Sequence, residues 1–112
     1  MTAAASEPLL LGILDVVQFV SIRMGLTMSS VSKRTNKTEP RLNEQRRLCW
    51  WAASKIVFPR PSSAEIAKAV QRESSTVREA LARVQRMVTE DERFRSYAKQ
   101  ALGPFWSEEF LQ

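Results

Sequence analysis

The chain has 112 residues, the size of one domain, and 44% of them are hydrophobic, which suffices for a single modest core. Seventeen Lys and Arg residues outnumber twelve Asp and Glu residues, and the net charge of +5 favours a polyanionic partner, with nucleic acid the first candidate. The single cysteine, Cys49, excludes a disulfide framework, and with histidine absent it argues against a metal site and against proton transfer near neutral pH. We therefore expect no enzyme activity, no catalytic residue, no metal and no cofactor.

The N-terminal region is apolar with a helical pattern. Apolar residues at spacings of three and four predict a first helix from about Leu9 to Met24, and Gly25 ends it. Asp15 and Gln18 interrupt the apolar run and no basic residues precede it, which argues against a signal peptide and a membrane span. We expect a core helix here, in a cytoplasmic protein that has no membrane partner.

A strongly basic stretch follows. Thr27 is suited to cap a short second helix that contains Val31, and a polar loop runs from Lys33 to Thr38. The segment 33–60 holds eight basic and two acidic residues, a net charge of +6. Such a run is usually a solvated surface, but its position before a helix-turn-helix pattern favours contact with nucleic acid.

A third helix is expected from Pro40, which suits the first turn of a helix, until Pro59 and Pro61 end it. We interpret the adjacent Trp50 and Trp51 as packing residues rather than as platforms for stacked bases. The apolar stripe of this helix consists of Leu42, Cys49, Ala52, Ala53 and Ile56.

The next two helices have the pattern of a helix-turn-helix. Ser62 and Glu65 form a capping box for a short helix, a polar turn follows, and Ser74 or Ser75 caps a longer helix. Such a helix can enter a major groove when its first residues are short and polar and its inner face is braced by apolar packing. Its predicted inner face consists of Val77, Leu81, Val84 and Val88, and its other faces carry Arg78, Arg83 and Arg86.

The C-terminal region completes the fold. Thr89 and Glu92 form a second capping box for a last helix, which Gly103 and Pro104 end. No stretch alternates as a strand would, so we predict an all-α fold, a compact bundle of about six helices over residues 9–102.

Two tails flank this domain, residues 1–8 and residues 103–112. The second is aromatic and acidic, with Phe105, Trp106 and Phe110. We expect these aromatic side chains to pack back on the domain, while docking to a protein partner or to a second copy is the alternative.

Three stretches match parts of one known family. Ser32-Lys33-Arg34 is similar to the family's basic loop, 63–67 to its first motif helix, and Arg72-Glu73-Ser74-Ser75-Thr76-Val77 to its signature. From about residue 13 to residue 102 the chain thus resembles the C-terminal DNA-binding domain, domain IV, of the bacterial chromosomal replication initiator DnaA, a helical domain of the Trp-repressor-like group. The resemblance implies that the signature contacts base edges in the major groove.

The resemblance also implies further contacts and some departures. Arg34 or Lys37 would enter the adjacent minor groove, and Arg83 falls where the family carries a basic residue. Glu73 stands where the family has Asp and Ser74 where it has His, which implies relaxed recognition of the DnaA box. No glycine-rich phosphate loop precedes a Lys-Ser or Lys-Thr pair, so an ATP-driven initiator is not expected.

The sequence therefore predicts a freestanding DnaA domain IV-like module that binds double-stranded DNA, associates with the nucleoid and regulates replication or transcription. The alternative is a protein-protein interaction module that has kept the fold and lost the residues that recognise DNA. The predicted DNA-contacting residues are Lys33, Arg34, Lys37, Arg46, Arg47, Arg72, Glu73, Ser74, Ser75, Thr76, Arg78 and Arg83.

Overall fold

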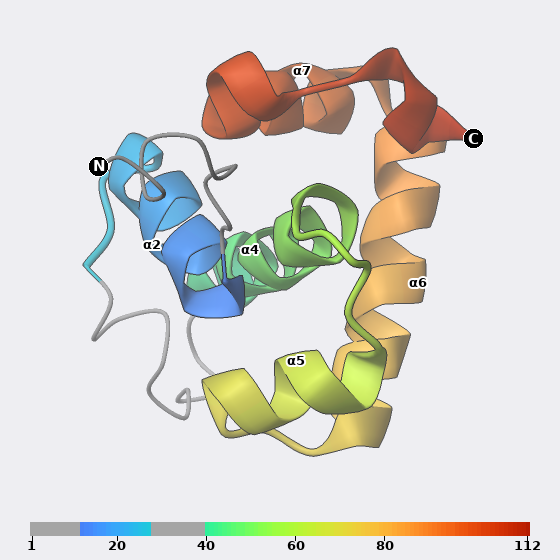
Figure 1. The fold of residues 1–112 in the computed structure, drawn as a ribbon. Helices are drawn as coiled ribbons and strands as arrows, with labels where there is room; N and C mark the ends of the chain where they lie inside the picture. The colour runs from blue at the N-terminus through green and yellow to red at the C-terminus, as the bar shows by residue number, and fades with distance from the viewer. Residues whose placement is uncertain (1–11, 28–39) are drawn as a thin grey trace, which may run out of the picture.

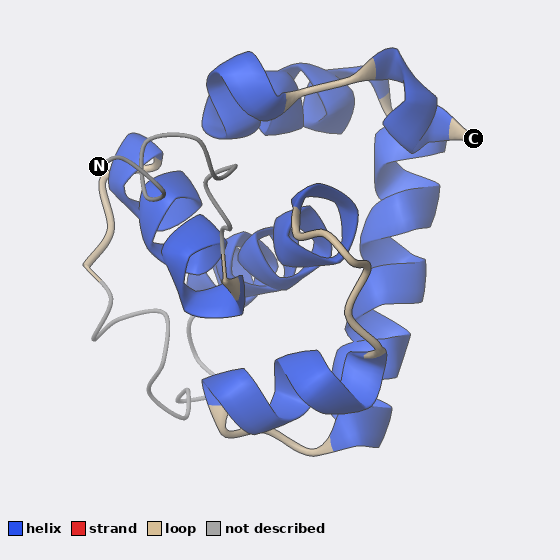
Figure 2. Ribbon diagram, in the orientation of Figure 1, coloured by secondary structure: helices blue, strands red, loops and turns tan. Residues whose placement is uncertain are grey.

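The structure is a computed structural model that describes residues 12–27 and 40–112. Within these ranges the chain is all-helical and contains no strand, which confirms the predicted fold class (Figure 2). The elements are α2 (Ile13–Arg23), α4 (Pro40–Ile56), α5 (Ser63–Val70), α6 (Ser74–Glu90) and α7 (Glu92–Leu102), then two 3-10 turns, η1 (Gly103–Phe105) and η2 (Glu108–Leu111). The predicted start of the first helix at Leu9, the second helix, and the loop residues Lys33, Arg34 and Lys37 lie outside the described residues.

The helices surround α4. Helix α2 packs against α4 and α7, and both α4 and α5 pack against α6. Helix α6 runs along one edge of the molecule, with α5 across its N-terminal end and α7 across its C-terminal end (Figure 1). The side of α6 that faces away from α4 is not covered by any other described helix (Figure 1).

The core explains the central place of α4. Six consecutive α4 residues, 48–53, are all buried, so this helix is enclosed on every side. They include Trp51 (1% exposed) and Cys49, which is fully buried, as the sequence predicts for packing residues. Each fully buried large apolar side chain contributes about 1.5–3 kcal/mol. The other helices complete the core with Val17, Val20, Ile66, Val77, Val84, Val88 and Leu102.

The start of α5 confirms the predicted capping box. The Glu65 N–H donates to Ser62 Oγ (3.1 Å), and the Ser62 N–H donates to Glu65 Oε1 (2.8 Å). The first helix is also capped, since the Gly12 N–H donates to Asp15 Oδ2 (2.8 Å). All three bonds satisfy backbone donors that a helix start otherwise leaves unpaired.

Two predicted caps are wrong. Glu73, not Ser74 or Ser75, occupies the N-cap of α6, and its side chain makes no capping hydrogen bond. The proposed box of Thr89 and Glu92 does not form either, because the Thr89 hydroxyl donates to the Gln85 carbonyl inside α6 (2.7 Å). Asp91 caps α7 instead, and its Oδ1 accepts from the Phe94 N–H (3.1 Å).

The C-terminal segment packs on the domain. The Trp51 ring contacts Phe110 edge-on, with ring centroids 5.9 Å apart, and it also contacts Trp106 (6.3 Å). Gln85 ties the segment to the core, because its Oε1 accepts from Trp51 Nε1 (3.0 Å) and its Nε2 donates to the Phe110 carbonyl (2.8 Å). The aromatic residues of η1 and η2 thus extend the core over the end of α6.

Candidate nucleic-acid interface

The connection between α5 and α6 is a tight turn. The Gln71 N–H donates to the Lys68 carbonyl (3.4 Å) and the Arg72 N–H to the Ala67 carbonyl (2.9 Å), the pattern of a Schellman motif. Gln71 has a φ of 59°, in the left-handed region that usually holds glycine. This turn fixes the angle between α5 and α6 and completes the helix-turn-helix.

Helix α6 is braced on one face and open on the other. Val77, Ala80, Val84 and Val88 are buried, with Leu81 partly buried beside them. The opposite face is exposed over its first thirteen residues, and it carries Ser74, Ser75, Thr76, Arg78, Glu79, Ala82, Arg83 and Arg86. These are the two conditions that a helix needs to lie in a major groove.

The first turn of α6 has free backbone donors. The first backbone hydrogen bond of α6 joins the Val77 N–H to the Glu73 carbonyl (3.1 Å). No described residue accepts a hydrogen bond from the N–H groups of Ser74, Ser75 and Thr76. These donors lie at the positive end of the helix dipole, where a phosphate oxygen is favourably placed.

A groove lined by three arginines runs beside α6. Its volume is about 420 Å³, and its lining includes Arg47 of α4 and both Arg83 and Arg86 of α6. Burial and the nearby Arg83 guanidinium lower the pKa of Arg47, while Glu44 opposes the shift. Guanidinium groups stay protonated at neutral pH, so three positive charges surround the groove. We call it the arginine groove; its lining residues are Arg47, Thr76, Glu79, Ala80, Ala82, Arg83 and Arg86.

The structure brings some predicted site residues together. Arg47, Thr76 and Arg83 meet in the arginine groove although they come from two helices. Ser75 and Arg78 are exposed on the open face of α6 next to it. Together these positions form one continuous surface along the first half of α6.

Other predicted residues lie elsewhere. Arg46 is only 3% exposed and its Nη1 donates to Asn43 Oδ1 (3.5 Å), so it is a buried residue and not part of this surface. Arg72 is half-buried in the turn, where its Nη1 donates to the Gln71 carbonyl (3.2 Å). Glu73 is exposed at the N-cap, at the outer edge of the surface.

Four lining residues were not among the predicted ones: Ala80, Ala82 and the two charged residues Glu79 and Arg86. Glu79 and Arg86 lie on the same face of α6 as Ser75 and Ala82, so their helical spacing alone could have identified them. Arg47 lines the groove because α4 packs against α6, and the helical spacing within one helix could not predict that packing.

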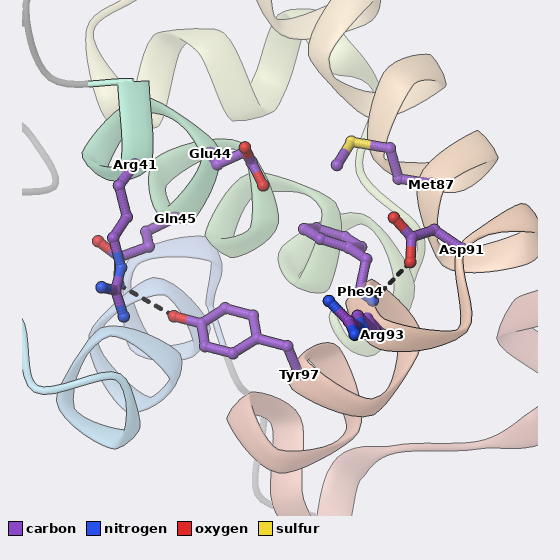
Figure 3. Close-up of a pocket in the computed structure, with 8 residues that line it drawn as sticks. All are labelled: Arg41, Glu44, Gln45, Met87, Asp91, Arg93, Phe94 and Tyr97. Atoms are coloured by element: carbon purple, nitrogen blue, oxygen red, sulfur yellow. Dashed lines mark hydrogen bonds between the residues drawn. The ribbon is translucent and has the colours of Figure 1, made fainter.

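A second hollow, of about 430 Å³, lies between α4 and the corner of α6 and α7 (Figure 3). Its walls are Met87, Phe94 and Tyr97, and the Tyr97 hydroxyl accepts a hydrogen bond from Gln45 Nε2 (2.9 Å). The charged residues among its described lining are Arg41, Glu44, Asp91 and Arg93, whose formal charges cancel. Unlike the arginine groove, this hollow has no net attraction for a polyanion.

No protein family model, curated protein sequence or solved structure matches the chain at a significant level. The resemblance to the initiator's DNA-binding domain therefore stays a prediction from the sequence. No helix in residues 12–27 and 40–112 is long and apolar enough to cross a membrane. The same residues include no group of three or more His, Cys, Asp or Glu side chains placed to hold a metal ion.

Proposed function

We propose that this chain binds double-stranded DNA, with the open face of α6 in the major groove and the arginine groove on the adjacent phosphates. The observation that carries the proposal is the convergence of Arg47, Arg83 and Arg86 beside the exposed face of a braced helix. Base edges and phosphates lie next to each other along one groove wall of a duplex, so one rigid surface can contact both.

The two parts of the surface have different roles in this proposal. Guanidinium groups that neutralise phosphates release bound counterions, which supplies affinity that depends on salt and not on sequence. The short side chains at the start of α6 approach the base edges closely, and the unpaired N–H groups of Ser74 and Ser75 are available to a phosphate oxygen. Arg34 or Lys37 is proposed to reach the minor groove, as the resemblance implies.

In its biological role the chain is proposed to occupy DNA as a regulator of replication or transcription, without catalysis. Its similarity to the DNA-binding domain of a replication initiator supports this role. The net charge of +5 supports association with the nucleoid for the same electrostatic reason.

Fluorescence anisotropy tests the proposal most directly. The wild-type chain is titrated against a labelled DNA duplex of mixed sequence and against an RNA duplex of the same length, at several salt concentrations. We expect salt-dependent binding to DNA and weaker binding to RNA, because the narrow major groove of A-form RNA does not admit a helix. Absence of binding to DNA at low salt would overturn the proposal and favour a protein-interaction module. Equal affinity for both duplexes would mean that the chain binds phosphate charge without placing α6 in the major groove.

A further inference from the structure

Among the described residues, Glu79 is the only acidic one that lines the arginine groove. Its neighbours three residues before and four residues after it on α6 are Thr76 and Arg83, which line the same groove. Within the described ranges Glu79 forms no ion pair, although a helical spacing of four would allow one with Arg83. Its carboxylate is exposed, and no hydrogen bond joins it to another residue in the part of the chain that the structure describes.

An exposed carboxylate at this position opposes the electrostatic part of DNA binding. It repels the phosphates that the three arginines attract, and it makes no hydrogen bond within residues 12–27 and 40–112. If Glu79 served only to support the helix, it would be expected to contact Arg83. Without that contact the carboxylate is available as a hydrogen-bond acceptor close to the proposed DNA surface.

Glu79 lies on the face of α6 that is turned away from the core. Ser75, Arg78, Glu79 and Ala82 are all exposed and have the spacing i, i+3, i+4 and i+7, so they share the face opposite the buried residues of α6. A recognition helix in the major groove presents a face of this spacing to the base edges. In that geometry Glu79 lies where the face toward the bases meets the arginine groove, so its carboxylate is within reach of a base edge.

The donors and acceptors on the base edges indicate which base a carboxylate can bind. Cytosine offers its N4 amino group as a donor in the major groove, and a carboxylate is a matching acceptor. Adenine also has an amino group there, but its neighbouring N7 is an acceptor and repels a carboxylate. Guanine and thymine present acceptors at the corresponding position.

We propose that Glu79 is a specificity-determining residue that accepts a hydrogen bond from the N4 amino group of a cytosine in the bound duplex. This inference rests on the proposed DNA binding. The same carboxylate lowers the affinity for duplexes that lack the cytosine, because there it faces phosphates and base acceptors without compensation. Discrimination thus combines one attractive and one repulsive contact.

The test compares Glu79→Gln with Glu90→Gln. Both variants remove one negative charge from exposed positions of α6, but Glu90 is the last residue of the helix and lies far from the groove. Bound sequences are selected from a random DNA duplex library for wild type and both variants, and affinities are then measured for the selected site with and without its cytosine.

We expect the wild type to select a motif with a cytosine at one position and to prefer it by about 5- to 150-fold over other bases there. Glu79→Gln should weaken that preference, admit adenine, whose N6 and N7 match the donor and acceptor of a glutamine amide, and bind random duplexes more tightly, while Glu90→Gln should keep the wild-type motif. An unchanged motif in Glu79→Gln, or a motif without cytosine in the wild type, would overturn the assignment but leave DNA binding intact. Failure of the wild type to bind any duplex would instead overturn the proposed function itself.

Discussion

The double substitution Arg83→Ala and Arg86→Ala should weaken DNA binding and flatten its salt dependence. Both side chains are exposed on α6 and line the arginine groove, so their removal leaves the packed face of the helix untouched. Each phosphate that a protein neutralises contributes about −0.9 to the slope of log affinity against log salt. If each of the two guanidinium groups neutralises one phosphate, the slope should fall in magnitude by about 1.8.

The same reasoning gives the loss of affinity. Relative to a reference near 1 M salt, a slope change of about 1.8 corresponds to about 1.8 log units at 0.1 M, or roughly 60-fold weaker binding. Anisotropy titrations of one labelled duplex over a range of salt concentrations measure both quantities. Circular dichroism should show an unchanged fold, because neither side chain belongs to the core.

The control is the double substitution Arg41→Ala and Arg93→Ala. These arginines line the second hollow, so the control removes the same charge from a surface that has no proposed contact with DNA. Charges further from the phosphates than about 10 Å are largely screened at 0.1 M salt, so the control should change the slope little. An unchanged slope in the groove variant, or equal losses in both variants, would refute the assignment of the groove to the phosphates.

Three further predictions concern stability and are measured by denaturant unfolding. Gln71→Gly should raise the free energy of unfolding by about 0.5–1 kcal/mol, because it relieves a left-handed residue; a decrease would contradict this. Gly103→Ala should lower it by about 1–3 kcal/mol, since Gly103 has a φ of 58° and a Cβ there would lie 2.7 Å from the Arg23 Cζ; a neutral effect would refute the reasoning. Burial raises the pKa of Cys49 to about 12, so stability should fall by about 1.4 kcal/mol per pH unit above the ordinary thiol pKa. Below that pKa the thiol is protonated in both states and this contribution is constant, and Cys49→Ala should remove this part of the alkaline decrease.

Much of the fold could be predicted from local signals. Pro40 starts α4 and the pair Ser62 and Glu65 starts α5, because each signal acts within one turn of helix. The start of α7 could not be predicted in the same way. Thr89 and Asp91 both suit an N-cap, and the choice of Asp91 depends on the Thr89 hydroxyl bonding to the preceding turn of α6.

The candidate site was less predictable, since it depends on how helices pack. Arg46 and Arg47 are neighbours in sequence, but successive residues on a helix point about 100° apart. One of them is therefore buried while the other lines the arginine groove. Which of the two is buried is decided by the packing of α4 on α6, and no local pattern contains that information.

The start of α6 departs most clearly from the rules that the rest of the chain follows. Ser62 and Asp91 cap α5 and α7 with side-chain hydrogen bonds, whereas Glu73 makes no such bond at α6. A serine at the N-cap would contribute about 1 kcal/mol, and Ser74 stands one residue too late to supply it. The chain thus forgoes stability at the one helix start that lies on the proposed interface. In exchange, short side chains and unpaired N–H groups stay open at the positive end of the helix dipole, which is what a helix that approaches DNA with its first turn requires.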